Sequence, residues 1–190
     1  MKILFATQNQ NKIEEVKNML PSGFELMGLN QFNFTDDIPE TQPTIEGNAI
    51  QKANFVFNTL KTPCFAEDTG LIVPSLNGEP GVYSARYAGP YRDPLKNMEK
   101  LLKKLSSEKS REAYFETVIA LKYGHKLETF VGRCKGRIAH EAKGSNGFGY
   151  DPIFIPEGYD LSFASLSKSI KNKISHRAIA MSKLIAYLSE

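Results

Sequence analysis

The chain contains 190 residues, of which 41% are hydrophobic and 24% are charged, a balance typical of a folded protein rather than a disordered one. None of its apolar runs approaches the ~20 residues that a helix needs to cross a bilayer, and no secretory signal follows Met1. We therefore expect a folded protein of the cytoplasm that has no membrane partner. Its two cysteines, Cys64 and Cys134, lack the spacing of a metal site or a disulfide scaffold, so we expect buried free thiols.

The formal net charge is only +3, but the charges are unevenly distributed along the chain. Basic residues crowd the C-terminal end, whereas Asp36, Asp37 and Glu40 form an acidic group earlier. This asymmetry suits a protein that binds an anionic ligand together with a cation. The same asymmetry would also suit weak binding of nucleic acid, so charge alone leaves both alternatives open.

Hydrophobic spacing predicts alternating strands and helices in the first third of the chain. Residues 2–6 form an apolar run typical of a buried strand, and apolar residues then recur at helical spacing from Ile13 until Pro21. A second strand is expected at residues 24–29 and a helix from about Gly47 to Leu60. This order places a polar loop where the first helix begins.

The middle of the chain has weaker signals. Short strands are expected at residues 64–66 and 71–73, separated by a polar break at residues 67–70. Gly, Pro and Tyr are frequent in residues 77–91, which we expect to form an ordered loop. An amphipathic helix follows at residues 94–105, with its lysines on the solvated face.

The remaining residues are predicted to form a hairpin and a closing helix. Residues 112–123 and 127–138 have strand character and are joined through Gly124, so we expect a β-hairpin in a second lobe. Apolar residues recur at helical spacing from Ile174 to Leu188. Because strands and helices mix without a dividing linker, we predict one α/β domain over residues 1–190 with a mixed sheet.

A polar run between the first strand and the first helix is the first candidate site. Backbone N–H groups and the dipole at the start of a helix bind phosphate oxygens well. The side chains of Thr7, Asn9 and Lys12 would add donors. The alternative is an ordinary polar turn in which Asn9 caps the helix. The run is not a P-loop, because it lacks the glycines and the Gly-Lys-Ser/Thr ending.

Acidic residues form the second candidate site. Glu40 lies in an irregular segment, and Glu67 and Asp68 are expected at the end of a strand. Mg²⁺ commonly takes one or two carboxylates and shares the phosphate oxygens of its substrate, so this sparse set is sufficient. A carboxylate nearby can also deprotonate a water. The alternative is that Glu67 and Asp68 only form a turn.

The third candidate site combines residues 147–152 with the basic residues Lys171, His176 and Arg177. Glycines on both sides of Phe148 would let a flat ligand approach and stack on its ring. The three basic side chains could donate hydrogen bonds to oxygens of a purine. In the alternative, Phe148 and Tyr150 are core aromatics, and His176 and Arg177 are exposed in the first turn of the last helix.

These segments together resemble the inosine triphosphate pyrophosphatases, also called XTP/dITP diphosphatases, nearly from end to end. The matching positions are Ala6-Thr7 with Asn9 and Lys12, Asn48-Ala49 with Lys52-Ala53, residues 67–71, residues 80–87, residues 148–154, and Lys171 with residues 174–178. Each motif is moderately specific, and their shared order strengthens the resemblance. Gln8, Glu67 and Gly47 depart from the residues most common in that family at these positions.

The resemblance implies two α/β lobes around an elongated mixed β-sheet flanked by helices, an active site in the cleft between the lobes, and a homodimer. It assigns Glu40 and Asp68 to Mg²⁺, and Asp68 also to the activation of water. The residues expected to bind the triphosphate are Thr7, Gln8, Asn9, Gln10, Asn11 and Lys12. Those expected to line the rest of the nucleotide site are Thr69, Ser84, Arg86, Phe148, Gly149, Tyr150, Asp151, Lys171, His176 and Arg177.

The implied reaction is hydrolysis of non-standard purine nucleoside triphosphates (ITP, dITP and XTP) to the monophosphate and pyrophosphate, which prevents their incorporation into nucleic acids. A related pyrophosphatase of pyrimidine or methylated nucleotides is one alternative. A non-catalytic nucleic-acid-binding module is another, although the sequence lacks a ribonucleoprotein-type aromatic motif and a zinc finger. We expect no nucleic-acid partner.

Overall fold

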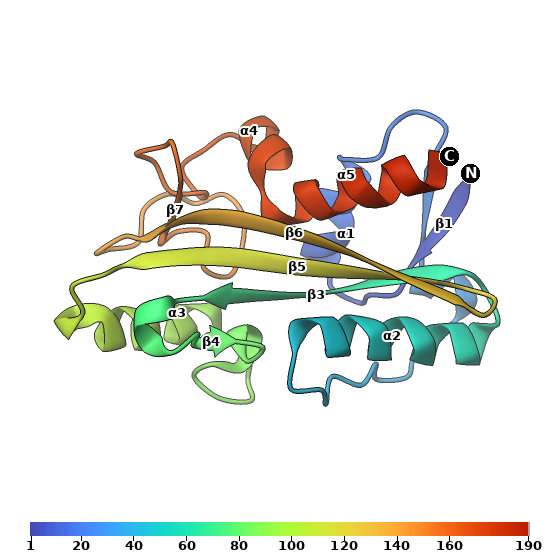
Figure 1. Cartoon of the computed structure of the whole chain (residues 1–190), viewed down its shortest axis with the longest axis horizontal. Coiled ribbons are helices and arrows are strands. Elements are labelled where there is room, and N and C mark those ends of the chain that lie inside the picture. Colours follow the sequence, from blue (N-terminus) through green and yellow to red (C-terminus); the bar gives the residue numbers. More distant parts are fainter. Residues whose placement is uncertain (190) are drawn as a thin grey trace. The chain divides into compact units, whose positions relative to one another are not determined.

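A mixed β-sheet organises the chain, and helices flank it (Figure 1). The computed structural model describes residues 1–189, and within them seven strands follow the order β2-β1-β3-β5-β6-β7, with β4 paired to β3. Strand β1 runs parallel to β2 and β3, whereas β4 is antiparallel to β3 and β7 is antiparallel to β6. The strands are β1 Lys2–Phe5, β2 Glu25–Gly28, β3 Cys64–Ile72, β4 Pro80–Gly81, β5 Glu112–Tyr123, β6 Lys126–Ile138 and β7 Phe154–Pro156.

Polar side chains cap the N-terminal ends of several helices. The side chains of Asn9, Thr44, Asp93 and Ser167 each accept a hydrogen bond from a backbone N–H of the first turn, which satisfies groups left unpaired there. The α-helices are α1 Gln10–Lys17, α2 Ile45–Leu60, α3 Pro94–Lys104, α4 Lys168–Ile174 and α5 His176–Ser189. The short 3₁₀ helices are η1 Leu29–Phe32, η2 Pro74–Leu76, η3 Ser84–Arg86 and η4 Leu105–Ser107. In the described part of the chain, no helix combines the length and apolar character needed to cross a membrane.

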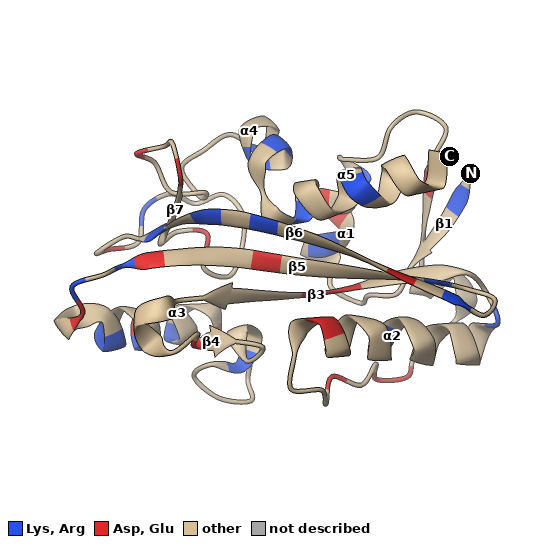
Figure 2. Ribbon diagram, in the orientation of Figure 1, with Lys and Arg blue, Asp and Glu red and all other residues tan. Residues whose placement is uncertain are grey.

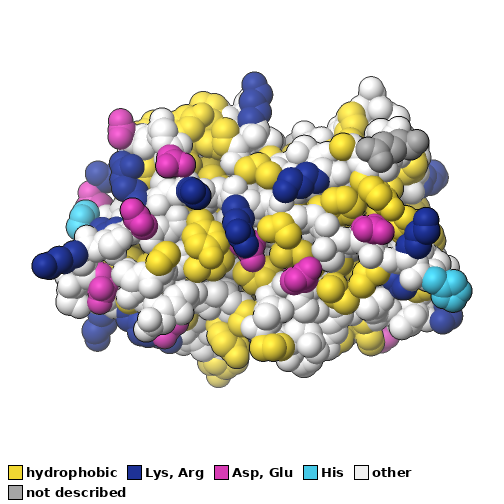
Figure 3. Space-filling view, in the orientation of Figure 1, with side chains coloured by type: hydrophobic (Ala, Val, Ile, Leu, Met, Phe, Trp, Pro, Cys, Tyr) yellow, Lys and Arg dark blue, Asp and Glu magenta, His cyan; other side chains and the backbone are white. Residues whose placement is uncertain are grey.

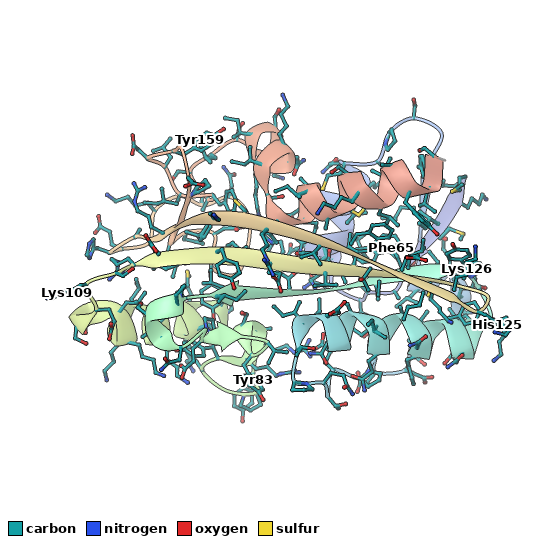
Figure 4. All side chains as sticks on the ribbon, in the orientation of Figure 1. Phe65, Tyr83, Lys109, His125, Lys126 and Tyr159 are labelled. Carbon is teal, nitrogen blue, oxygen red and sulfur yellow. The ribbon has the colours of Figure 1, made fainter. Side chains whose placement is uncertain are left out.

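The chain divides into two compact units, and three strands contribute residues to both. Unit 1 contains Met1–Asp68, Thr117–Gly132 and the chain from Arg177 onward, and unit 2 contains Thr69–Glu116 and Arg133–His176. The expected hairpin is present as β5 and β6, with His125 and Lys126 at its turn (Figure 4). Its placement in a second lobe was wrong, because both of its strands are shared between the units.

Unit 1 has helices on both faces of its part of the sheet (Figure 1). On one face, apolar side chains of α1 and α5 pack against β1, β3 and β5, and the Phe5 ring stacks on that of Phe65 with centroids 4.4 Å apart. On the other face, the Cys64 thiol of β3 donates to the Ala53 carbonyl of α2 at 3.5 Å. Alternate residues of a strand point to opposite faces, so the buried run at the start of β3 supplies both layers.

Unit 2 has its own apolar core, to which α3 and η4 contribute. Met98, Leu101 and Leu105 cluster with residues of β3, β5, β6 and β7. The lysines of α3 are exposed, as its amphipathic pattern predicts, but Leu95 is exposed as well. Cys134 of this core and Cys64 of unit 1 are both buried free thiols, which confirms that prediction.

Several predicted boundaries were wrong. Residues 64–72 form one strand rather than two strands around a polar break, because the carboxylates of Glu67 and Asp68 have basic partners in the interior. The predicted loop at residues 77–91 contains β4 and η3. Helix α1 ends at Lys17, before Pro21, and Ile174 ends α4 instead of opening the closing helix.

Candidate active site

The polar run after β1 leads into α1. Asn9 caps the helix by accepting from the Lys12 N–H at 3.3 Å, and the Thr7 hydroxyl accepts from the Asn9 N–H at 3.2 Å. The Gln8 amide donates to the Asp36 carbonyl at 3.2 Å and braces the turn. The alternative interpretation, in which Asn9 caps the helix, is therefore confirmed as far as the cap is concerned. Two further residues predicted to bind phosphate lie exposed in the first turn, where an anion can reach the helix start, namely Gln10 and Asn11.

The Lys12 side chain leads from this turn to a buried carboxylate in β3. Its Nζ lies 3.1 Å from Glu67 Oε1, and the Glu67 side chain has no exposed surface. Desolvation by burial lowers the pKa of Lys12, outweighing the opposite influence of Glu67, and the charges of Lys52 and Arg177 lower it further. Lys12 therefore carries a poorly hydrated cationic group that an additional anion would stabilise.

Arg177, the second residue of α5, binds the same glutamate. Its Nη2 donates to Glu67 Oε1 at 2.7 Å and its Nε to Glu67 Oε2 at 2.9 Å, a bidentate arrangement, while Nη1 donates to Glu15. Burial acts to raise the pKa of Glu67, but Arg177 and Lys12 hold it well below its ordinary value. The Arg177 side chain is only 1% exposed, so the alternative that placed it in solvent was wrong.

Asp68, the next residue of β3, binds partners on α2. Its Oδ1 accepts from Lys52 Nζ at 2.8 Å and its Oδ2 from the Asn48 amide at 3.3 Å. Lys52 Nζ also lies 3.0 Å from Glu40 Oε1, so one ammonium holds both carboxylates that were predicted to bind a metal. Although desolvation acts to lower it, the pKa of Lys52 is raised because Asp68 and Glu40 favour its charged form.

Strand alternation explains why the two acidic neighbours have different partners. Consecutive side chains of a strand point to opposite faces, so Glu67 reaches α1 and α5 while Asp68 reaches α2. Part of β3 is red in Figure 2 because this strand contains acidic residues. Lys52 and Asn48 had appeared in the sequence only as motif positions without a role. Their spacing of four residues, which places them on one side of a helix, was the signal that could have joined them to Asp68.

Other predicted residues lie in unit 2, and two of them contact each other. The Ser84 hydroxyl accepts from the Leu71 N–H at 2.8 Å and donates to the Gly81 carbonyl at 2.6 Å. Tyr150 is buried in the core, as the alternative interpretation predicted, and its hydroxyl donates to the Ser84 carbonyl at 2.8 Å. Thr69 and Arg86 of the same unit are half-buried.

A tight turn places Phe148, Asp151 and Lys171 together. Asp151 Oδ2 accepts from the Phe148 N–H at 2.8 Å and from Lys171 Nζ at 2.5 Å. Lys171 Nζ lies 5.2 Å from the centre of the half-buried Phe148 ring. Gly147 has φ +75° and no room for a side chain, since a Cβ there would collide with Asp151 Oδ2. Gly149, also with positive φ, completes the turn.

His176 is buried and stacks on Phe115, with ring centroids 4.5 Å apart. Its exposure in the alternative interpretation was therefore wrong as well. Basic residues at the start of a helix oppose its dipole, and for Arg177 the carboxylates of Glu15 and Glu67 compensate this cost.

The sequence matches the Ham1 family over residues 3–187. The chain belongs to the Ham1 family. A protein of Flavobacterium johnsoniae named dITP/XTP pyrophosphatase is 51% identical over 189 residues, covering 100% of this chain and 98% of that protein. A protein of Thermoanaerobacter pseudethanolicus with the same name is 45% identical over 193 residues, covering 99% of this chain and 96% of that protein.

Solved structures of Ham1 proteins have the same fold as this chain. The Ham1 protein of Staphylococcus aureus superposes with a TM-score of 0.90 at 41% identity, covering 100% of this chain and 98% of that one. A HAM1 protein of Coxiella burnetii gives a TM-score of 0.91 at 35% identity, with the same coverage. These comparisons confirm the predicted family and the α/β fold with a mixed sheet and flanking helices.

Proposed function

We propose that this Ham1-family chain hydrolyses ITP, dITP and XTP to the nucleoside monophosphate and pyrophosphate, and so keeps these nucleotides out of nucleic acids. The observation that carries the proposal is the pair of carboxylates, Glu40 and Asp68, gathered on Lys52 in the same unit as the anion-binding start of α1. Relatives named dITP/XTP pyrophosphatase over the whole chain length support the same activity.

The donor set fits Mg²⁺. Among residues 1–189, no three His, Cys, Asp or Glu side chains gather into a group that could hold a metal ion by themselves. Mg²⁺ does not need one, because it commonly binds one or two carboxylates, several waters and the phosphate oxygens of a substrate. Glu40 and Asp68 would hold it. When bound, the ion would supply Lewis-acid polarisation of phosphate oxygens.

The chain's own groups suit the remaining steps of the reaction. Asp68, which accepts a hydrogen bond from the Asn48 amide, would accept a proton from the water that attacks the α-phosphorus. Lys12 would stabilise the negative charge that develops on the pyrophosphate leaving group, with the N–H groups at the start of α1 binding its oxygens.

Phe148 and Lys171 of unit 2 suit recognition of the base. The half-buried Phe148 ring offers a stacking surface, and the Lys171 ammonium beside it is a donor for the 6-carbonyl of hypoxanthine or xanthine. Adenine has an amino donor at this position and would place it against the ammonium. A role of Arg177 in contacting the base requires its ion pair with Glu67 to open.

The test is pyrophosphate release across a panel of ITP, XTP, dITP, ATP, GTP and pyrimidine triphosphates, each with Mg²⁺ and with chelator. We expect rapid release from the inosine and xanthosine nucleotides with Mg²⁺ and loss of activity with chelator. Comparable hydrolysis of ATP would contradict the proposed specificity, and a preference for pyrimidine nucleotides would favour the related pyrophosphatase.

The proposal includes a cytoplasmic homodimer that binds a small nucleotide and neither nucleic acid nor membrane. On the face shown in Figure 3, basic and acidic side chains are interspersed, whereas nucleic-acid binding favours a surface of one sign. Light scattering of the purified chain measures its oligomeric state, and salt-sensitive retention of RNA or DNA on filters would contradict the absence of a nucleic-acid partner.

A further inference from the structure

The ammonium of Lys52 lies between the two carboxylates proposed to bind the metal. Its Nζ is 3.0 Å from Glu40 Oε1 and 2.8 Å from Asp68 Oδ1. The Lys52 side chain is 6% exposed, compared with 24% for Glu40 and 11% for Asp68. Lys52 therefore neutralises two acids that water hydrates only in part, and without it their mutual repulsion would be weakly screened.

A divalent cation bound by both acids would need nearly the same space. An ion that took Glu40 Oε1 and Asp68 Oδ1 as ligands would compete with the ammonium for the same two oxygens and would lie close to it. Two cations at such a distance in a poorly hydrated site repel each other strongly. The Lys52 ammonium can move away, because it lies at the end of a flexible side chain.

We infer that Lys52 is an exchangeable internal counter-ion, which holds Glu40 and Asp68 in the metal-free protein and is displaced from them when the divalent cation binds. The inference rests on the proposed metal site and adds to it a role for a residue outside the metal's ligand set. It has two consequences. Lys52 stabilises the metal-free fold, and it weakens metal binding because the two cations compete. Once displaced, its ammonium is available to the phosphate groups of the substrate.

Metal binding in the absence of nucleotide tests the inference directly. Mn²⁺ is the probe, and its free concentration is followed by electron paramagnetic resonance in the full chain and in Lys52→Met. We expect Lys52→Met to bind Mn²⁺ roughly tenfold more tightly than the wild type, a coupling of ordinary size. Lys52→Arg keeps the positive charge and should bind no more tightly than the wild type. Equal or weaker binding by Lys52→Met would overturn the inference.

Thermal unfolding gives a second measurement that does not depend on activity. Metal-free Lys52→Met should unfold at a lower temperature than the wild type, and saturating Mn²⁺ should raise its midpoint by more than it raises that of the wild type. The matched control is Lys104→Met, which removes a lysine that is exposed and paired with Glu79. This control should leave Mn²⁺ affinity unchanged. If Lys52→Met does not fold, Lys52→Gln takes its place, since it removes the charge and retains a donor.

The two proposals fail differently. Absence of Mn²⁺ binding in both the wild type and Lys52→Met, or pyrophosphate release from ITP that is equally fast in chelator, would contradict the metal site and the inference with it. Measurable binding by the wild type with unchanged affinity in Lys52→Met would contradict only the displacement of Lys52.

Discussion

Glu67 and Asp68 are consecutive residues of β3, and their carboxylates bind helices on opposite faces of the strand. Glu67 pairs with Arg177 of α5, and Asp68 pairs with Lys52 of α2. The strand thus separates two buried ionic groups that the sequence places side by side. The Glu67 group ties the start of α5 to the sheet, and the Asp68 group gathers the acids proposed to bind the metal.

The Glu67 group should contribute strongly to stability. Glu67→Gln leaves the Arg177 guanidinium buried with a weaker partner, and breaking a buried pair in this way costs about 3–5 kcal/mol. We expect a loss of that size in the free energy of unfolding, measured with urea. The control is Glu25→Gln, which breaks an exposed pair with Lys2 and should cost less than about 1 kcal/mol. Equal effects of the two substitutions would show that burial does not strengthen the Glu67 pair.

The same pair predicts how stability depends on pH. Burial acts to raise the folded-state pKa of Glu67, but the charges of Arg177 and Lys12 outweigh it and lower that pKa. Its contribution to stability is therefore fully present above the unfolded pKa of about 4.3 and is lost as pH falls below it. We expect the free energy of unfolding to decrease from about pH 5 toward about pH 3. The decrease should be smaller in Glu67→Gln, which has no proton to gain at this position.

Local spacing and motif order were enough to predict the family, the class of fold and most helices and strands. They did not predict that β3 continues through Glu67 and Asp68. Glu67 and Asp68 precede Gly70, which is the pattern of a turn. Their burial is favourable only because basic residues that are distant along the chain pair with them. Arg177, for example, lies 110 residues away from Glu67 along the chain. A single sequence carries no direct signal for such a pairing.

The cysteines give a prediction that is independent of catalysis. Burial raises the pKa of Cys64 to about 12 and that of Cys134 to about 11. Because the thiolate is the reactive form, both thiols should be inert toward a disulfide reagent at neutral pH in the folded protein. Both should react promptly once denaturant unfolds the chain. Rapid reaction of either thiol before unfolding would contradict its burial.

Asp68→Asn tests the proposed proton acceptor. The amide retains the size of the side chain but accepts a proton poorly, so we expect pyrophosphate release from ITP to fall by about 10²–10⁴-fold. Near-ultraviolet circular dichroism should remain that of the folded protein. The control is Glu46→Gln in the first turn of α2, where the side chain is exposed and contacts Thr129, and it should retain turnover. Wild-type turnover in Asp68→Asn would remove this residue from the mechanism.

Asp151→Asn should reduce discrimination between ITP and ATP. The Asp151 carboxylate holds the Lys171 ammonium beside the Phe148 ring. Asparagine has no negative charge, so it would hold the ammonium less firmly. A protein group that hydrogen-bonds the correct substrate can favour it over the wrong substrate by ~10⁴-fold or more, when the wrong substrate leaves that protein group unpaired. If Lys171 donates to the 6-carbonyl, kcat/KM for ITP should fall while that for ATP changes little. Lys171→Met should change the ratio in the same direction, and the double variant should add little to it.

Two glycine substitutions separate this effect from strain in the turn. Gly147 and Gly149 have φ values of +75° and +63°, so an alanine at either position is strained. Only at Gly147 would the new Cβ collide with Asp151 Oδ2, whereas at Gly149 no atom beyond the two neighbouring residues lies within 4 Å of it. Gly147→Ala must therefore displace the carboxylate that holds Lys171, and Gly149→Ala need not. We expect the ITP to ATP ratio of kcat/KM to fall more in Gly147→Ala than in Gly149→Ala. Equal ratios in the two variants would mean that Asp151 does not position the group that reads the base.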